Sequence, residues 1–222
     1  MKTIKKTVEN SLINHFIYII EKEALRKKAK KQRLSLVLTG GKSPINLYKK
    51  LAIKKIDWSN IDLFWGDERF VSKRSKNSNY KLAYETFIKK INISKNNIFS
   101  INTNIKNITK CSQNYSNLLK KYFKNKKICF DIFLLGMGED GHIASIFPNS
   151  DELSRKFISR PVVRKDFKRI TLSLNLINNS KKIILWLNNK NKAKKFNKLI
   201  CKGKKIPINN LKKNKTLIFK VI

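Results

Sequence analysis

A histidine that follows a glycine-rich turn is the residue of this chain best suited to acid–base chemistry, because imidazole transfers protons near neutral pH. The turn reads GMGEDGH over 136–142, directly after the apolar run 130–135. Such a run is typical of a buried strand, and open α/β sheets bind ligands at the carboxyl ends of their strands. An isolated Asp-Gly-His triplet would more often be an ordinary turn, so a site is favoured only because two other segments have the same design. The candidates here are Gly136, Gly138, Asp140 and His142.

The first of these segments is TGGKSP at 39–44, which follows the short apolar run 34–38 and precedes apolar residues at helical spacing from Ile45. A strand, a glycine turn and a proline that opens a helix form a cradle in which free backbone N–H groups face a phosphate. A plain strand-to-helix turn would read in the same way, and the residues alone leave both interpretations open. The candidates are Gly40, Gly41, Lys42 and Ser43.

The second segment is Gly66-Asp67-Glu68-Arg69, at the end of the apolar run 61–65. Arg69 offers a two-pronged donor for a phosphate or carboxylate, and Asp67 could orient a donor or accept a hydrogen bond from a sugar hydroxyl. A solvated loop with an internal ion pair is the alternative. Farther along, Ser78 or Asn79 is expected to cap the next helix.

The periodicity of apolar residues predicts strands that alternate with helices along the whole chain. The expected strands are 34–38, 61–65, 98–101, 130–135, 157–163, 170–174, 183–187 and 216–221, and the expected helices are 7–31, 45–51, 80–88, 108–123, 174–179 and 193–201. This alternation indicates an α/β fold, with an open, mostly parallel twisted sheet and helices on both faces. The length of 222 residues fits a single domain over 1–222.

The net charge of +37 suggests a nucleic-acid partner at first sight. However, only eight of the 51 basic residues are arginine, and the lysines are spread over almost every polar segment. Together with the abundance of Asn and Ile, this indicates a compositional bias, such as an AT-rich genome would impose, rather than a phosphate-binding surface. We therefore expect no specific nucleic-acid partner, although the charge would steer a small anionic substrate.

The composition predicts a globular protein, with 41% hydrophobic and 10% aromatic residues. No apolar run approaches the roughly 18–20 residues of a spanning helix, so no membrane association is expected. The apolar patch 12–20 near the start is interrupted by Asn14 and His15 and has no cleavage site, which argues against a signal peptide. Three scattered cysteines form neither a disulfide framework nor a metal spacing, so we expect no metal and a reducing, cytoplasmic location.

Three blocks, taken in order, resemble the bacterial 6-phosphogluconolactonases of the sugar-phosphate isomerase-like superfamily. They are LTGGKSP at 38–44, WGDER at 65–69 followed by Ser78-Asn79-Tyr80, and the segment 130–148 from the apolar run to Pro148. The resemblance covers nearly the whole chain, including RITL at 169–172 and the Lys192-Ala193 pair. It implies a Rossmann-like fold, hydrolysis of the δ-lactone of 6-phosphogluconate without a cofactor, and a monomer or weak homo-oligomer.

Glucosamine-6-phosphate deaminases share this fold, a glycine-rich phosphate loop and the Asp-Gly-His-Ile-Ala segment. That family continues with Phe-Asn-Glu-Pro, whose glutamate assists ring opening, whereas Phe147 holds that place in this chain. The deaminases also carry Asp-Glu-Tyr where this chain has Arg69. Both differences favour the lactonase. The chain departs from the lactonase pattern before Lys192, where the usual glycine is missing, and near the C-terminus, where Phe219-Lys220 replaces a common aspartate.

We hypothesise that His142 takes a proton from water as the water attacks the lactone carbonyl, and then protonates the departing ring oxygen. Asp67 would orient His142 or a substrate hydroxyl, and backbone N–H groups near 40–41 or 136–138 would hold the oxyanion. A nucleic-acid-binding protein on an enzyme fold and a catalytically inactive sugar-phosphate sensor remain alternatives. Phosphate binding is expected from Lys42, Arg69, Arg169 and Lys192, and further substrate contacts from Gly40, Gly41, Ser43, Asn79, Gly136, Gly138 and Asp140.

Overall fold

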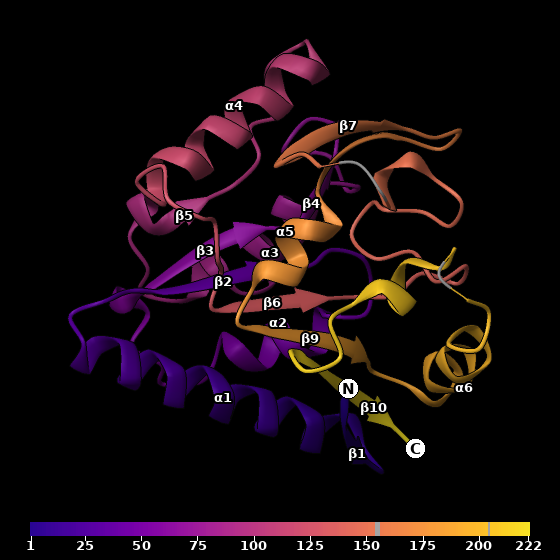
Figure 1. Cartoon of the computed structure of the whole chain (residues 1–222). Helices are drawn as coiled ribbons and strands as arrows, with labels where there is room; N and C mark the ends of the chain where they lie inside the picture. Colours follow the sequence, from indigo (N-terminus) through magenta and orange to yellow (C-terminus); the bar gives the residue numbers. More distant parts are fainter. Residues whose placement is uncertain (154–155, 204) are drawn as a thin grey trace.

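A seven-stranded sheet forms the centre of the molecule in the computed structural model, which describes residues 1–153, 156–203 and 205–222. Every neighbouring pair in this sheet is parallel, and the strand order is β1-β10-β9-β6-β2-β3-β5. The strands are β1 (Lys2–Lys6), β2 (Leu34–Leu38), β3 (Ile61–Trp65), β5 (Ile98–Phe99), β6 (Ile132–Leu135), β9 (Lys182–Leu187) and β10 (Thr216–Val221). Figure 1 shows the two chain ends together at one edge, where β1 pairs with β10.

The central strands β2, β3 and β6 are buried along their whole length. Successive side chains of a strand point to opposite faces, so complete burial means that both faces of the sheet are covered. The helices are α1 (Glu9–Ala29), α2 (Ile45–Leu51), α3 (Asn79–Thr86), α4 (Ile108–Tyr122), α5 (Leu174–Asn179) and α6 (Lys190–Leu199), with short 3-10 turns at 58–60, 88–90, 95–97, 151–153 and 207–210. The predicted open, mostly parallel α/β fold is confirmed.

The strand order reverses between β2 and β6, which are neighbours although about a hundred residues separate them along the chain. From β2 the chain continues outward to β3 and β5, and from β6 it continues in the other direction to β9 and β10. Such a reversal leaves a crevice outside the carboxyl ends of the two strands, because their connections run to opposite sides. The glycine turns after β2 and after β6 both begin at this crevice.

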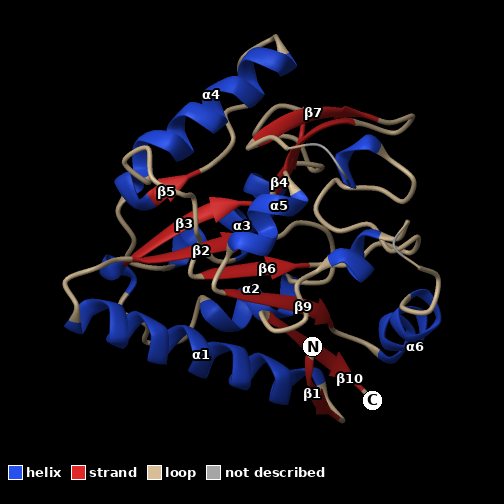
Figure 2. Cartoon of the chain, in the orientation of Figure 1, coloured by secondary structure: helices blue, strands red, loops and turns tan. Residues whose placement is uncertain are grey.

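A second, antiparallel sheet joins β4 (Asp67–Arg69), β8 (Lys168–Leu172) and β7 (Ser159–Val163). Figure 2 shows β7 on the same side of the molecule as α4. The strands expected near 157–163 and 170–174 correspond to β7 and β8, but β4 was not predicted. The reason is that β4 is three polar residues long and carries no apolar alternation, so only its pairing with β8 makes it a strand.

The first strand, β1, was also missed. Its sequence KTIKK has no apolar alternation, and it lies at the edge of the sheet, where little of it is buried. Helix boundaries differ by a few residues: α6 begins at Lys190, three residues before the predicted start, and Pro44 precedes the first residue of α2. Ser78 caps α3, since its side chain accepts a hydrogen bond from the Lys81 N–H. No helix in the described part of the chain has the length and apolar character to cross a membrane.

A buried charge ties the amino ends of β2 and β6 together, at the opposite end of the strands from the crevice. Asp131 accepts hydrogen bonds from the backbone N–H and the hydroxyl of Ser35, both at 3.0 Å. Its carboxylate also pairs with Lys27 at 2.9 Å and Lys181 at 2.8 Å. Burial alone would raise the pKa of Asp131, but the hydrogen bonds from Lys181 and Lys27 outweigh it and hold that pKa below its ordinary value.

Candidate active site

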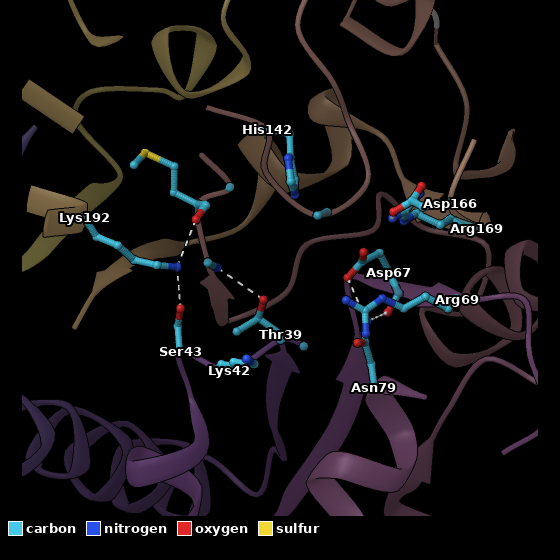
Figure 3. A pocket seen from close by; sticks show the side chains of 16 residues that line it. Thr39, Lys42, Ser43, Asp67, Arg69, Asn79, His142, Asp166, Arg169 and Lys192 are labelled. Carbon is cyan, nitrogen blue, oxygen red and sulfur yellow. Dashed lines mark hydrogen bonds and ion pairs between the residues drawn. The ribbon is translucent and has the colours of Figure 1, made fainter. Parts of the chain in front are cut away.

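A cavity of about 330 Å³ lies at the crevice, and segments from across the chain line it. All the predicted site residues except Asp140 belong to its lining (Figure 3). They are Gly40, Gly41, Lys42, Ser43, Asp67, Arg69, Asn79, Gly136, Gly138, His142, Arg169 and Lys192. Four lining residues were not among the predicted ones, namely Thr39, Met137, Ala144 and Asp166. The roles assigned to these residues from the sequence stay predictions.

His142 projects into the cavity from the turn after β6, as Figure 3 shows. The turn is closed by the Gly138 N–H, which donates to the His142 carbonyl oxygen at 2.9 Å. A side chain on Gly138 would displace the imidazole, because its Cβ would lie 2.0 Å from the Cε1 atom of the ring. The imidazole also packs on Phe147, with 4.6 Å between ring centroids. The ring is therefore held by contacts with glycine backbone and with an aromatic ring.

Asp140 fixes the imidazole of His142 through a hydrogen bond of 2.6 Å between Nδ1 and Oδ1. The same oxygen accepts from the backbone N–H of His142 at 3.1 Å. Burial would raise the pKa of Asp140, but these hydrogen bonds from His142 prevail and lower it, so Asp140 accepts as a carboxylate. A carboxylate at Nδ1 requires the proton on that nitrogen, so that in the neutral imidazole Nε2 is the acceptor.

Of the two roles predicted for Asp67, toward His142 or toward a substrate hydroxyl, the structure favours the second, because the imidazole of His142 is held by Asp140 and the carboxylate of Asp67 has other partners. Its Oδ2 atom accepts a hydrogen bond from the Ser145 hydroxyl at 2.7 Å, and its Oδ1 atom accepts one from Asn79 Nδ2 at 3.3 Å. The physical reason is that Asp67 lies on β4, on another wall of the cavity, whereas Asp140 is two residues from the histidine in the same turn. A role for Asp67 toward a substrate hydroxyl stays a prediction.

One end of the cavity, here called the lysine end, consists of Lys42, Ser43 and Lys192. Lys192 Nζ donates to Ser43 Oγ at 2.5 Å and to the Met137 carbonyl oxygen at 3.1 Å. Its position comes from the first turn of α6, where its backbone N–H donates to the capping side chain of Asn189. Desolvation lowers the pKa of Lys192. The lysine thus joins the turn after β2 to the turn after β6.

The other end, the arginine end, consists of Arg69 and Arg169 with the carboxylates of Asp67 and Asp166 (Figure 3). The two arginines are direct neighbours across the β4–β8 pair. Arg69 Nη1 donates to the Asn77 carbonyl oxygen at 2.9 Å. Arg169 holds Asp166 with both nitrogens of its fork, at 2.8 and 2.5 Å. The four predicted phosphate-binding cations therefore form two groups rather than one.

Glu68 lies buried beneath the arginine end and connects β4 to the start of α3. Its carboxylate accepts from the backbone N–H groups of Arg69, Asn79 and Tyr80 at 2.7–2.8 Å. Burial raises the pKa of Glu68 to about 7, against the effect of these donors. The side-chain amide of Asn79 packs so closely on Gly40 that a Cβ there would lie 1.9 Å from the amide oxygen. Glu68 was not predicted as a site residue, although it stands between two that were.

Asp166 was missed because it lies in a polar segment, 164–169, that reads as a basic connection between strands. The only available signal was its spacing of three residues from Arg169. Ser145 and the three lining residues Thr39, Met137 and Ala144 fall inside the recognised blocks but have no chemistry that singles them out. Within 1–153, 156–203 and 205–222, no cluster of three or more His, Cys, Asp or Glu side chains is arranged to hold a metal ion.

Comparison with known proteins gives a family match over residues 7–219, to the family described as glucosamine-6-phosphate isomerases/6-phosphogluconolactonase. The 6-phosphogluconolactonase of Synechocystis is 31% identical over 177 residues, which are 78% of this chain and 74% of the relative. The 6-phosphogluconolactonase of Nostoc is 32% identical, with 85% of this chain and 82% of the relative covered.

Solved structures agree with the fold. The 6-phosphogluconolactonase of Thermotoga maritima has a TM-score of 0.82 at 24% identity and covers 99% of both chains. A monomeric glucosamine-6-phosphate deaminase has a TM-score of 0.81 at 21% identity and covers 99% of this chain and 97% of its own. Both activities thus occur on this fold, and the backbone alone does not separate them. The sequence match over 7–219 and the relatives above 30% identity show that the chain belongs to the family of glucosamine-6-phosphate isomerases and 6-phosphogluconolactonases.

Proposed function

We propose that the protein hydrolyses 6-phospho-D-glucono-1,5-lactone to 6-phospho-D-gluconate. The observation that carries the proposal is the imidazole of His142, whose Nδ1 is held by Asp140 and whose ring lines a cavity with a cationic end. The names of the curated relatives support the same activity. Two residues favour lactone hydrolysis over deamination: Phe147 packs on the imidazole in the place of the deaminase glutamate, and Arg69 lines the cavity.

The charges of the cavity favour the lysine end as the phosphate site. Lys42 and Lys192 carry two positive charges, and no carboxylate in the described lining accompanies them. At the arginine end, by contrast, the carboxylates of Asp67 and Asp166 balance the two arginines. A phosphate dianion is attracted more strongly by the two lysines, because the Glu139 carboxylate that acts on Lys192 lies outside the lining and is 82% exposed. Ser43 and Lys192 supply donors for the phosphate. This refines the prediction that all four cations bind phosphate.

With the phosphate at the lysine end, the lactone ring extends past His142 toward the arginine end. His142 Nε2 takes a proton from water while the water oxygen forms a bond to C1 of the lactone. The bond between C1 and the ring oxygen then breaks, and the ring oxygen receives the proton from the imidazolium. The new carboxylic acid ionises and releases one proton. A positioned base and oxyanion donors suffice for such an activated ester.

Contacts within the fold leave fewer candidates for the donors that would stabilise the oxyanion. The Gly136 N–H donates to Thr39 Oγ1 at 3.2 Å, and the Gly138 N–H donates to the His142 carbonyl oxygen. Both groups are therefore already engaged, as is the fork of Arg169 with Asp166, which favours the backbone at 40–41 and the guanidinium group of Arg69. The oxyanion would then be stabilised by groups fixed by the two sheets before the substrate arrives, as electrostatic stabilisation requires.

The test is acid release after the addition of freshly prepared lactone, measured against the uncatalysed rate. His142→Ala should lower kcat by about two to four orders of magnitude with a modest change of KM. His15→Ala is a matched control, because the only other histidine lies on α1 against Phe219, outside the cavity lining. It should retain full activity. Near-normal turnover of a folded His142→Ala protein would refute the general-base assignment.

The same measurements separate the two alternative functions. A sensor would bind 6-phosphogluconate but would not open the lactone faster than water does. A nucleic-acid-binding protein would bind DNA or RNA with an affinity that falls steeply with salt, and it would be indifferent to substitution of Arg69. The two cationic ends and the oriented imidazole have no purpose in that second case, so we favour the enzyme.

A further inference from the structure

Asp166 is the acidic residue of the cavity whose contacts the proposed reaction leaves unexplained. It lies in the turn that joins β7 to β8, where its Oδ1 atom also accepts the backbone N–H of Phe167 at 2.9 Å. Its side chain is 59% exposed, whereas that of its partner Arg169 is only 10% exposed. The carboxylate thus stands at the entrance, and the arginine that it holds lies deeper in the wall.

The geometry of this ion pair is that of a bound carboxylate. Both terminal nitrogens of Arg169 donate to Asp166, one to each oxygen, in the parallel arrangement that arginine forms with carboxylate ligands. A ligand carboxylate at the arginine end would need the same donors or those of the adjacent Arg69. It would also come close to the negative charge of Asp166. The guanidinium holds the pKa of Asp166 well below its ordinary value, so this charge is present at neutral pH.

The lactone and its product differ in their charge at C1. The lactone carries charge only on its phosphate, whereas the product carries a further carboxylate at C1, the atom that the proposed pose directs toward the arginine end. We propose that Asp166 is a specificity residue that occupies Arg169, so that the cavity accepts the uncharged lactone ring and disfavours sugar phosphates with a carboxylate at C1. This inference rests on the proposed function, and it explains how a strongly basic protein avoids retaining its own trianionic product.

The experiment is a comparison of equilibrium binding for two ligands that differ only at C1, 6-phosphogluconate and glucitol 6-phosphate. Calorimetric titration at low ionic strength, repeated with added salt, would use the wild type, Asp166→Asn and Asp57→Asn. Asparagine keeps an oxygen for Arg169 and for the turn, but it removes the charge. Asp57 is a matched control, since it is also a largely exposed aspartate in an ion pair, with Lys28 at 2.7 Å, and it does not line the cavity.

Asp166→Asn should bind 6-phosphogluconate about five- to tenfold more tightly relative to glucitol 6-phosphate, the effect of one partly solvated charge near another. Added salt should reduce this gain, and Asp57→Asn should leave the ratio of the two affinities unchanged. Product inhibition should strengthen by the same factor.

An unchanged ratio would overturn the inference, because the charge of Asp166 would then not act on a C1 carboxylate. Equal weakening of both ligands would overturn it as well, since Asp166 would then position Arg169 or contact a hydroxyl that both ligands share. A wild type that binds both ligands but does not open the lactone would refute the proposed function alone. If the wild type binds neither ligand, the proposed function fails and the inference fails with it.

Discussion

Replacing Asp140 by asparagine should slow turnover while leaving substrate binding almost intact. Asp140 holds His142 through a charge-assisted hydrogen bond of 2.6 Å. Such bonds contribute about 1.5–3 kcal/mol, and the partial exposure of both side chains, 33% for His142 and 47% for Asp140, places this one near about 1.5–2 kcal/mol. At about 1.4 kcal/mol per factor of ten, kcat should fall about ten- to thirtyfold. KM should change little, since Asp140 does not line the cavity.

The assay is again acid release from the lactone, with kcat and KM determined separately. Glu139→Gln is the matched control, because this neighbouring carboxylate is 82% exposed and contacts Lys195 rather than the imidazole. Its kcat should equal that of the wild type. Asparagine can present an N–H to Nδ1 and so favour the other imidazole tautomer, which acts in the same direction. If Asp140→Asn kept a kcat within twofold of the wild type, or if Glu139→Gln lost as much, the orienting role of Asp140 would be refuted.

Two further substitutions distinguish an effect on the turn that carries His142 from an effect on the stability of the fold. Gly138→Ala should lower kcat about a hundredfold, because its Cβ would displace the imidazole. The melting temperature should stay nearly constant. Normal activity would contradict this prediction, since it would show that the turn can adapt. Asp131→Asn should instead reduce the free energy of unfolding by about 3 kcal/mol in urea titrations, and leave kcat unchanged, because it leaves two lysines unpaired at the other end of the strands. The fold lowers the pKa of Asp131, so the stabilisation from its carboxylate is present above the unfolded pKa of about 4 and is lost as the pH falls through the folded pKa. The stability difference between Asp131→Asn and the wild type should therefore become smaller below pH 4.

The parts of the fold that the sequence could predict are those whose local signal agrees with their burial. The central strands β2, β3 and β6 are continuous apolar runs, and they are buried on both faces. The strands β1 and β4 carry no such signal, because an edge strand and a three-residue strand exist only through their partners β10 and β8. Register and partnership are long-range properties, and periodicity along one segment cannot encode them.

The same distinction applies to the cavity. Glycine turns after buried strands indicated that residues 40–43, 136–138 and 142 would meet, because parallel strands bring their carboxyl ends to one edge. The partner of His142 stayed open in the sequence, where Asp67 could serve either the histidine or a substrate hydroxyl. Only the path of the turn brings Asp140 to the imidazole. Asp166 was beyond prediction for a different reason. Its importance comes from its position opposite Arg169 across a tight turn, in a segment whose composition is that of any solvated loop.

The cationic composition makes the placement of the acidic residues informative. The chain has 14 acidic residues against 51 basic ones, yet Asp67, Glu68, Asp140 and Asp166 all lie in or beside one cavity. Each has specific partners at hydrogen-bond distance, and each sets a different property: the position of Asn79, the start of α3, the tautomer of His142 and the occupancy of the Arg169 donors. Most of the added lysines can occupy solvated surface, where they need no specific partner. A lysine cannot replace any of these four carboxylates, because an ammonium group in any of their places would leave donors facing donors. We therefore expect the charge pattern of the cavity, rather than the net charge of the chain, to determine which anion the protein binds and how it is oriented.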